Sequence, residues 1–251
     1  MEGLHFHSTS SLSGWLLAGT VVLLALFGVR KRLPAIPLGR ASTWLRIHVD
    51  VGVISLATFG MHAWYKPQTG FQAPGGILEI LLASAYLVTA ASGIVGLGLS
   101  RLVPPILTAG GDELIFDRLP IYRRDLRERA EALVVQASAD SGTTTLADFY
   151  QRALAGFFSG PKHFWQHVVQ SPAPRVLLAH EFEAVHRYLN DRERELAGEL
   201  ARLVEKKAEA DHARALQGVL RLWLAIHLAL TGALLVLAVT HVVIVYRFGA
   251  A

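Results

Sequence analysis

Two apolar stretches of the sequence share one design: RIHVDVGVISLATFGMHAW at residues 46–64 and LAIHLALTGALLVLAVTHVVIVY at residues 224–246. Each contains two histidines that are 14 positions apart. The four residues are His48, His62, His227 and His241. A helix turns about 100° and rises about 1.5 Å per residue, so the two rings on each stretch point within about 40° of one direction and lie about 21 Å apart. Both stretches therefore predict helices that carry one imidazole near each end of a single face.

The whole chain has the composition of a membrane protein. Of its 251 residues, 52% are hydrophobic and 18% are charged, and the mean hydropathy is +0.38. A helix needs about 20 mainly apolar residues to cross the hydrocarbon core of a bilayer. Four runs meet that need, and we expect them to form an all-α membrane four-helix bundle. They are Leu12–Val29, Trp44–Trp64, Ile77–Leu99 and Val219–Tyr246.

Most of the charge lies in one block, residues 101–218, which holds 16 Lys and Arg and 17 Asp and Glu. The rest of the chain has 8 basic and 3 acidic residues. Opposite charges recur in the block at three- and four-residue spacing, which is typical of solvated helices. We therefore expect three transmembrane helices in residues 1–100, a helical insertion in residues 101–218, and a transmembrane helix in residues 219–251 that completes the bundle. The pattern allows the insertion's last helix to continue into the fourth span.

The link between the first and second spans is strongly basic and has no acidic residue. Its basic side chains are Arg30, Lys31, Arg32, Arg40 and Arg46. The next link has only Lys66. Because basic residues in short loops stay on the cytoplasmic side, we expect an integral protein of a bacterial inner membrane with both termini outside the cytoplasm. Residues 101–218 are then cytoplasmic.

Spans that alternate in direction make the second and fourth parallel, which puts His48 level with His227 and His62 level with His241. Two imidazoles on neighbouring helices can bind a haem iron from its two axial sides. The chain has no cysteine, which excludes zinc-thiolate sites, Cys-ligated iron–sulfur clusters and covalently attached haem. A separation of about 21 Å along each helix argues against one shared metal centre. The alternative for each histidine is a hydrogen-bonded packing residue.

The two quoted stretches resemble the paired-histidine helices of di-haem membrane cytochromes b, a group that includes respiratory cytochrome b and the ferric-reductase-like proteins. The resemblance implies two non-covalent b-type haems, one between His48 and His227 and one between His62 and His241, which relay electrons between the membrane faces. It covers these two helices and not the charged block. The sequence has no Gly-rich nucleotide fingerprint followed by an acidic ribose ligand, so we expect other subunits to supply substrate oxidation.

Several further residues are candidates for contacts with haem. We expect Gly52 and Gly60 to let a ring approach the backbone, with ordinary helix packing as the alternative. Basic side chains near a membrane face suit the anionic haem propionates, with snorkelling to lipid headgroups as the alternative. These side chains are Arg46, Arg101 and Arg221. Two threonines one turn from a histidine are candidates to orient the imidazoles. They are Thr58 and Thr231.

The leading hypothesis is a membrane cytochrome b subunit of an oxidoreductase complex, which carries electrons across the bilayer between a quinone or soluble redox partner and a partner on the opposite face. Residues 101–218 offer a docking surface for other subunits, and we expect no nucleic-acid partner. One alternative is a self-contained transmembrane reductase of an external metal ion or oxygen species. Another is a membrane anchor without haem, whose histidines pack and whose charged block recruits proteins.

Overall fold

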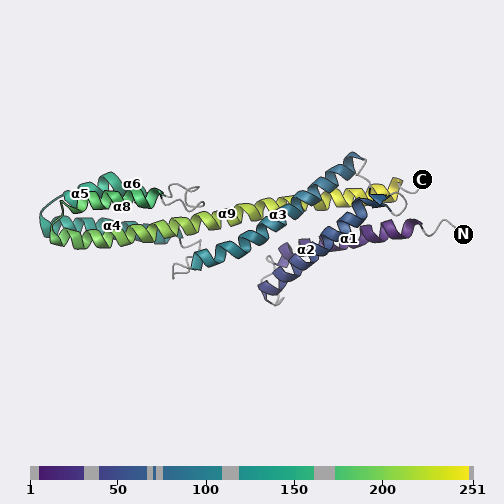
Figure 1. Cartoon of the computed structure of the whole chain (residues 1–251), viewed down its shortest axis with the longest axis horizontal. Helices are drawn as coiled ribbons and strands as arrows, with labels where there is room; N and C mark the ends of the chain where they lie inside the picture. Colours follow the sequence, from purple (N-terminus) through teal and green to yellow (C-terminus); the bar gives the residue numbers. More distant parts are fainter. Residues whose placement is uncertain are drawn as a thin grey trace. The chain divides into compact units, whose positions relative to one another are not determined.

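The computed structural model describes residues 6–30, 40–66, 70–71, 76–108, 119–160 and 173–248. This part of the chain is helical apart from one short antiparallel ladder of two residues a strand, β1 Tyr65–Lys66 and β2 Gly70–Phe71. The helices are α1 Phe6–Arg30, α2 Ala41–Ala63, α3 Ile77–Thr108, α4 Leu119–Ser141, α5 Thr145–Phe149, the π-helical turn η2 Tyr150–Leu154, α6 Ala155–Phe158, α8 Ala173–His186 and α9 Asp191–Phe248 (Figure 1). The predicted all-α class is confirmed.

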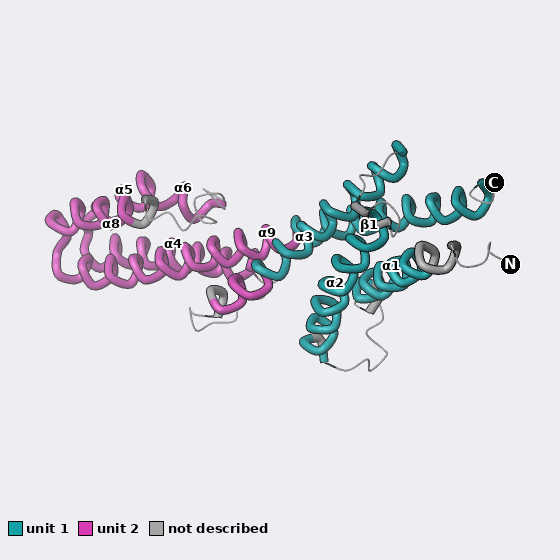
Figure 2. The backbone as a smooth tube through the Cα atoms, turned by 45° about the vertical axis from the view of Figure 1, so that its right-hand side comes forward, with its two compact units in different colours: residues 1–99, 222–251 teal, residues 100–221 magenta. Residues whose placement is uncertain are grey.

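The chain divides into two compact units (Figure 2). The first unit comprises residues 1–99 and 222–251, and the second comprises residues 100–221. Helix α9 is unbroken from Asp191 to Phe248. The charged helix of the insertion therefore continues directly into the last apolar helix, as the sequence pattern allowed.

The first unit has a small core to which each of its four long helices contributes. Its buried hydrophobic residues are Val21 of α1, Phe59 of α2, Ala83 and Tyr86 of α3, and Leu234 of α9. The rings of Phe59 and Tyr86 stack with their centroids 4.1 Å apart, and the Tyr86 hydroxyl lies 2.8 Å from Ser55 Oγ. Since the two buried hydroxyls partner each other, neither pays the cost of an unsatisfied polar group.

Two helices, α3 and α9, are long and apolar enough to span a membrane by length and composition in the described residues. The apolar run of α1, Leu12–Gly28, is shorter, and α2 contains Arg46 and Asp50 as well as its two histidines. The prediction of four spanning helices is therefore supported for two of them. Charged groups within a segment lower its apolar character, because each is costly to place in hydrocarbon.

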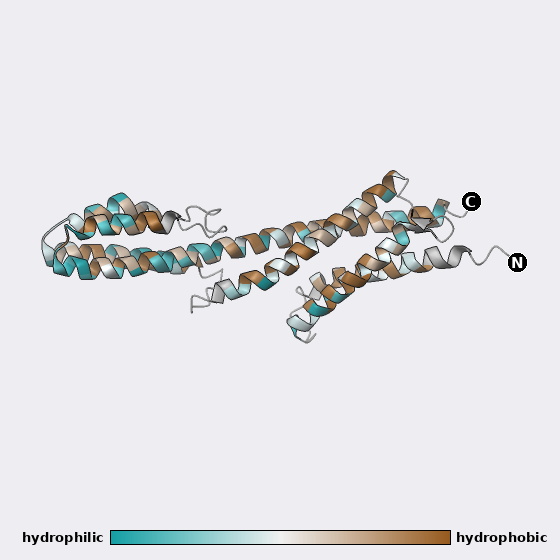
Figure 3. Ribbon diagram, viewed as in Figure 1, coloured by the Kyte–Doolittle hydropathy of each residue, from teal (hydrophilic) through white to brown (hydrophobic). Residues whose placement is uncertain are grey.

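All four long helices of the first unit are rich in apolar residues (Figure 3). Each of them exposes large apolar side chains. The exposed fraction is 58% for Leu16 of α1, 67% for Val53 of α2, 68% for Ile94 of α3 and 67% for Val236 of α9. A monomeric protein in water rarely exposes large continuous apolar surfaces. The outer surface of this unit is therefore suited to a lipid or protein environment.

The second unit packs α4, the segment α5–η2–α6, α8 and the first part of α9 around its own apolar core. On α4 the buried residues recur at four-residue intervals, as Leu126, Ala130 and Val134 show. This spacing places them on one face of the helix. The opposite face carries exposed ion pairs at i,i+4 spacing, such as Arg124 with Glu128. Burial of an apolar stripe, rather than the surface charge, holds the helix in place.

Helix α9 begins at a capping box. The Glu193 backbone N–H donates to Asn190 Oδ1 at 2.8 Å, and the Asn190 N–H donates to Glu193 Oε2 at 3.0 Å. The second carboxylate oxygen of Glu193 accepts bonds from the hydroxyls of Ser141, the last residue of α4, and Thr143, in the turn that follows. Between them, Gly142 has a φ of 69°, which glycine adopts without steric cost. The buried Glu193 thus satisfies the start of α9 and ties it to α4.

Candidate functional site

Two of the four histidines face α1 from α2. The imidazole of His48 lies against the ring of Phe27, with centroids 5.0 Å apart. At the other end of the helix pair, His62 Nδ1 lies 3.2 Å from the hydroxyl of Ser13. Ser13, near the start of α1, thus contacts a residue near the end of α2. Phe27, near the end of α1, contacts a residue near the start of α2. The two helices are therefore antiparallel, with both imidazoles at their interface.

On α9, His227 is held against α3. Its Nδ1 lies 3.2 Å from the hydroxyl of Ser92, and its ring stacks on Trp223 with centroids 5.4 Å apart. The Trp223 Nε1–H donates to the Ser92 carbonyl oxygen at 2.9 Å. The imidazole is therefore restrained from two sides, by a hydroxyl and by an aromatic face.

Helix α1 also contacts α9. Because α1 contacts both helices that carry the histidines, positions along α1 relate the two helices to each other. A Cβ at Gly28 would lie 3.5 Å from Leu228, and the Trp15 Nε1–H donates to the Tyr246 hydroxyl at 3.1 Å. Helix α9 is thus antiparallel to α1 and parallel to α2.

Register along α1 then relates the histidines to one another. His48, opposite Phe27, is level with the region of Leu228, the neighbour of His227. His62, opposite Ser13, belongs to the end of the unit where α9 reaches Tyr246, about one turn beyond His241.

The imidazole nitrogens differ in their surroundings. The Nδ1 of His48 is buried without a hydrogen-bond partner among the described residues. His241 is half-buried. No group of three or more metal-ligating side chains gathers in the described ranges.

The remaining predicted residues have varied environments. A Cβ at Gly52 or at Gly60 would meet nothing within 4 Å, so the surface of α2 is open there. Three arginines are exposed, of which the first lies in the first unit and the other two in the second. They are Arg46, Arg101 and Arg221.

The hydroxyls of the two threonines bond to backbone carbonyls of their own helices. The Thr58 hydroxyl donates to the Ile54 carbonyl at 2.9 Å, and the Thr231 hydroxyl donates to the His227 backbone carbonyl at 2.8 Å. Each hydroxyl thus bonds to the carbonyl four residues earlier in its own helix, which is a common hydrogen bond of threonine in a helix interior.

The residues that touch the imidazoles were missed by the sequence reasoning. They are Ser13, Phe27, Ser92 and Trp223. Two of them are serines followed directly by glycine within an apolar helix, as in Ser13–Gly14 and Ser92–Gly93. A serine followed directly by a glycine within an apolar helix is a sequence signal that could have identified these two residues. Which histidine each serine meets depends on helix packing.

Gly96 is required by the packing of α3 on α9, because a Cβ there would overlap the indole ring of Trp223. Gly96→Leu is expected to destabilise the first unit by about 1–3 kcal/mol, the cost of overpacking, and to lower its thermal midpoint in detergent, as circular dichroism would record. Gly98→Leu is the matched control, since a Cβ at that position meets nothing within 4 Å. Equal midpoints for the two variants would contradict this account.

The second unit contains a buried network of charges. Lys207 is fully buried and pairs with Asp211, and its Nζ also donates to the Gly160 carbonyl at 3.0 Å. Arg123 Nε lies 3.1 Å from Asp211 Oδ1 without hydrogen-bond geometry. Burial lowers the pKa of the Arg123 guanidinium, and the charge of Asp211 opposes that shift. One carboxylate thus compensates two buried cations.

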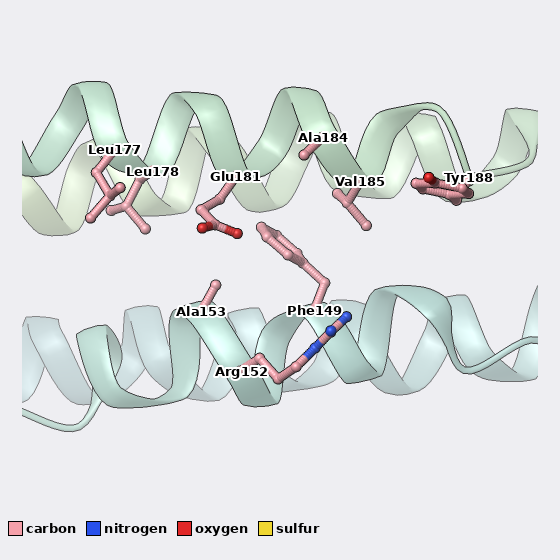
Figure 4. Close-up of a pocket in the computed structure, with 9 residues that line it drawn as sticks. All are labelled: Phe149, Arg152, Ala153, Leu177, Leu178, Glu181, Ala184, Val185 and Tyr188. Atoms are coloured by element: carbon pink, nitrogen blue, oxygen red, sulfur yellow. The ribbon is translucent and has the colours of Figure 1, made fainter.

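A hollow of about 440 Å³ lies in the second unit between α8 and the segment α5–η2 (Figure 4). Phe149 points from α5 toward α8, and Leu178 and Val185 line the facing side. Arg152 and Glu181 are its charged lining residues. None of the predicted site residues lines it, so it is separate from the histidine pairs.

No family model, curated protein or solved structure matches the chain. A helical architecture by itself supports many unrelated functions. The function of the chain is therefore inferred from the side-chain geometry of its first unit.

Proposed function

We propose that the first unit binds two b-type haems, between His48 and His227 and between His62 and His241, and carries electrons across a membrane as a subunit of a redox complex. The observation that carries the proposal is the level placement of His48 and His227 on two parallel helices, given by the contact of His48 with Phe27 and by the approach of Leu228 to Gly28. The second pair follows at the same spacing along both helices. Histidines that only pack against neighbouring helices would not require the same 14-residue spacing on both helices.

The surroundings of the imidazoles fit haem ligation. A buried Nδ1 without a partner at His48 is costly, and a bound group or a small ring rotation would relieve that cost. Hydroxyl partners at His62 and His227 resemble the hydrogen bonds that orient ligating histidines in metal sites. The open surface at Gly52 and Gly60 leaves the backbone of α2 accessible. When bound, each haem supplies a one-electron iron couple.

The surface of the first unit favours a bilayer as its environment. Apolar side chains are exposed on each of its four long helices, and α3 and α9 have the length and composition of spanning helices. In the proposed topology all four helices cross a bacterial inner membrane, residues 101–218 are cytoplasmic, and both termini lie outside the cytoplasm. The electron donor or acceptor is a quinone or a soluble redox protein, and residues 101–218 are a docking surface for other subunits.

The test is a reduced-minus-oxidised spectrum of the full chain purified in mild detergent, with haem quantified against protein. We expect b-type absorbance and about two haems per chain. A chain without such absorbance would instead be a membrane anchor. Subunits that copurify would support the role in a complex, whereas steady reduction of an added acceptor by the isolated chain would favour a self-contained reductase.

A further inference from the structure

At both ends of the first unit, a serine that is followed directly by a glycine contacts an imidazole. At one end Ser13 Oγ lies 3.2 Å from His62 Nδ1, and a Cβ at Gly14 would lie 2.9 Å from His62 Cε1. At the other end Ser92 Oγ lies 3.2 Å from His227 Nδ1, and a Cβ at Gly93 would lie 3.8 Å from His227 Cε1. The two serines lie on different helices, α1 and α3, so the two contacts are made by separate parts of the chain.

We propose that Ser13 and Ser92 are positioning residues that accept the Nδ1–H of His62 and of His227 and thereby present Nε2 of each ring as the ligating nitrogen. This inference rests on the proposed function, since it assigns these serines to the same two haems. Each proposed haem would then have one of its two histidines held by a serine, because His62 and His227 belong to different pairs.

The physical reason lies in the two nitrogens of imidazole. A neutral ring that binds a metal through one nitrogen carries its proton on the other, and that N–H needs an acceptor when buried. The hydroxyl supplies the acceptor and fixes the rotation of the ring. It also increases the basicity of the ligating nitrogen.

The glycine that follows each serine leaves room for the imidazole. At Gly14 a side chain would press on the His62 ring, since 2.9 Å is closer than carbon atoms normally approach. At Gly93 the approach of 3.8 Å is ordinary contact, and the ring of His227 is restrained in addition by Trp223. The fit is therefore tighter at Gly14, while the hydroxyl contact is the same at both ends.

His48 is held in a different way. Its ring contacts Phe27, and its Nδ1 has no hydrogen-bond partner among the described residues. Loss of Ser92 should therefore change one ligand of the haem between His48 and His227 and leave the other ligand as it was. The same variant should leave the haem at His62 unaffected.

The test is a potentiometric titration of the haem-loaded full chain, with electron paramagnetic resonance of its ferric form. Ser13→Ala and Ser92→Ala are each expected to raise one of the two midpoint potentials, because a less basic imidazole stabilises ferric iron less. The two variants should shift different steps of the titration, and each should change one low-spin signal. Loss of one haem in a serine variant also supports the role.

Thr58→Val and Thr231→Val are the matched controls, since each removes a hydroxyl that bonds only a carbonyl of its own helix in the recorded contacts. Both should retain the potentials and signals of the unmodified chain. If that chain titrates in two steps and neither serine variant departs from it, the positioning role is wrong while the proposed function stands. If the unmodified chain binds no haem, both are wrong.

Discussion

Replacing His227 by alanine is expected to reduce the haem content of the purified chain from about two to about one per polypeptide. A bis-histidine haem is held only by its two axial nitrogens and by packing, so removal of one ligand at the His48 pair releases that haem or converts it to a high-spin form. The other pair retains both of its imidazoles. The double variant His62→Ala/His227→Ala removes one ligand from each pair and should leave no low-spin b-type spectrum.

The measurement is haem per protein by pyridine haemochrome assay, with the low-spin signal as the second readout. His180→Ala is the control, because this exposed histidine of α8 lies in the second unit, where its neighbour Glu183 is 4.0 Å away. It should retain both haems. Equal loss in His180→Ala, or none in His227→Ala, would show that these histidines are not the ligands.

Replacing Asp211 by alanine is expected to destabilise the second unit by about 3–5 kcal/mol, the usual cost of removing one partner from a buried ion pair. The side chain of Asp211 has an exposed fraction of 2% and contacts both Lys207 and Arg123. Without it, two cations remain in a site where water cannot replace the lost carboxylate. The transition should be followed by urea-dependent proteolysis of the full chain, with cleavage scored within residues 119–160.

Glu128→Ala is the control, because it also removes a carboxylate from an i,i+4 pair. The pair of Glu128 with Arg124 has exposed fractions of 59% and 81%, and an exposed pair contributes only about 0.2–1 kcal/mol. We therefore expect a small change in this variant. If Asp211→Ala and Glu128→Ala behave alike, burial of the charge network does not govern the stability of the second unit.

The helices themselves were largely predictable from the sequence. The apolar run at Ile77–Leu99 and the charged pattern before residue 218 depend on side chains three and four positions apart, and those neighbours lie on one face of a helix whatever else the chain does. The start of α9 was not predicted, although Asn190 and Glu193 form their capping box within one turn. The prediction of four spanning helices was less secure, because the polar residues of α2 lower its apolar character.

The contacts of the candidate site were not predictable in the same way. Thr58 and Thr231 were singled out because they are one turn from a histidine, but a hydroxyl in a helix is readily satisfied by the carbonyl four residues earlier. The imidazoles are instead met by Ser13 and Ser92, which lie 49 and 135 positions away in the chain. The indole of Trp223 beside Gly96 is a contact of the same kind.

By itself the sequence determined where the helices lie, that the charge is concentrated in one block, and that two helices each carry histidines 14 positions apart on one face. These properties follow from local spacing and from the repeat of the α-helix. Only the tertiary structure decided which faces meet and which hydroxyl or ring contacts each imidazole. The reason is physical: an apolar helix can bury several of its faces, and the choice among them is made by side chains on other helices, through close packing and hydrogen bonding.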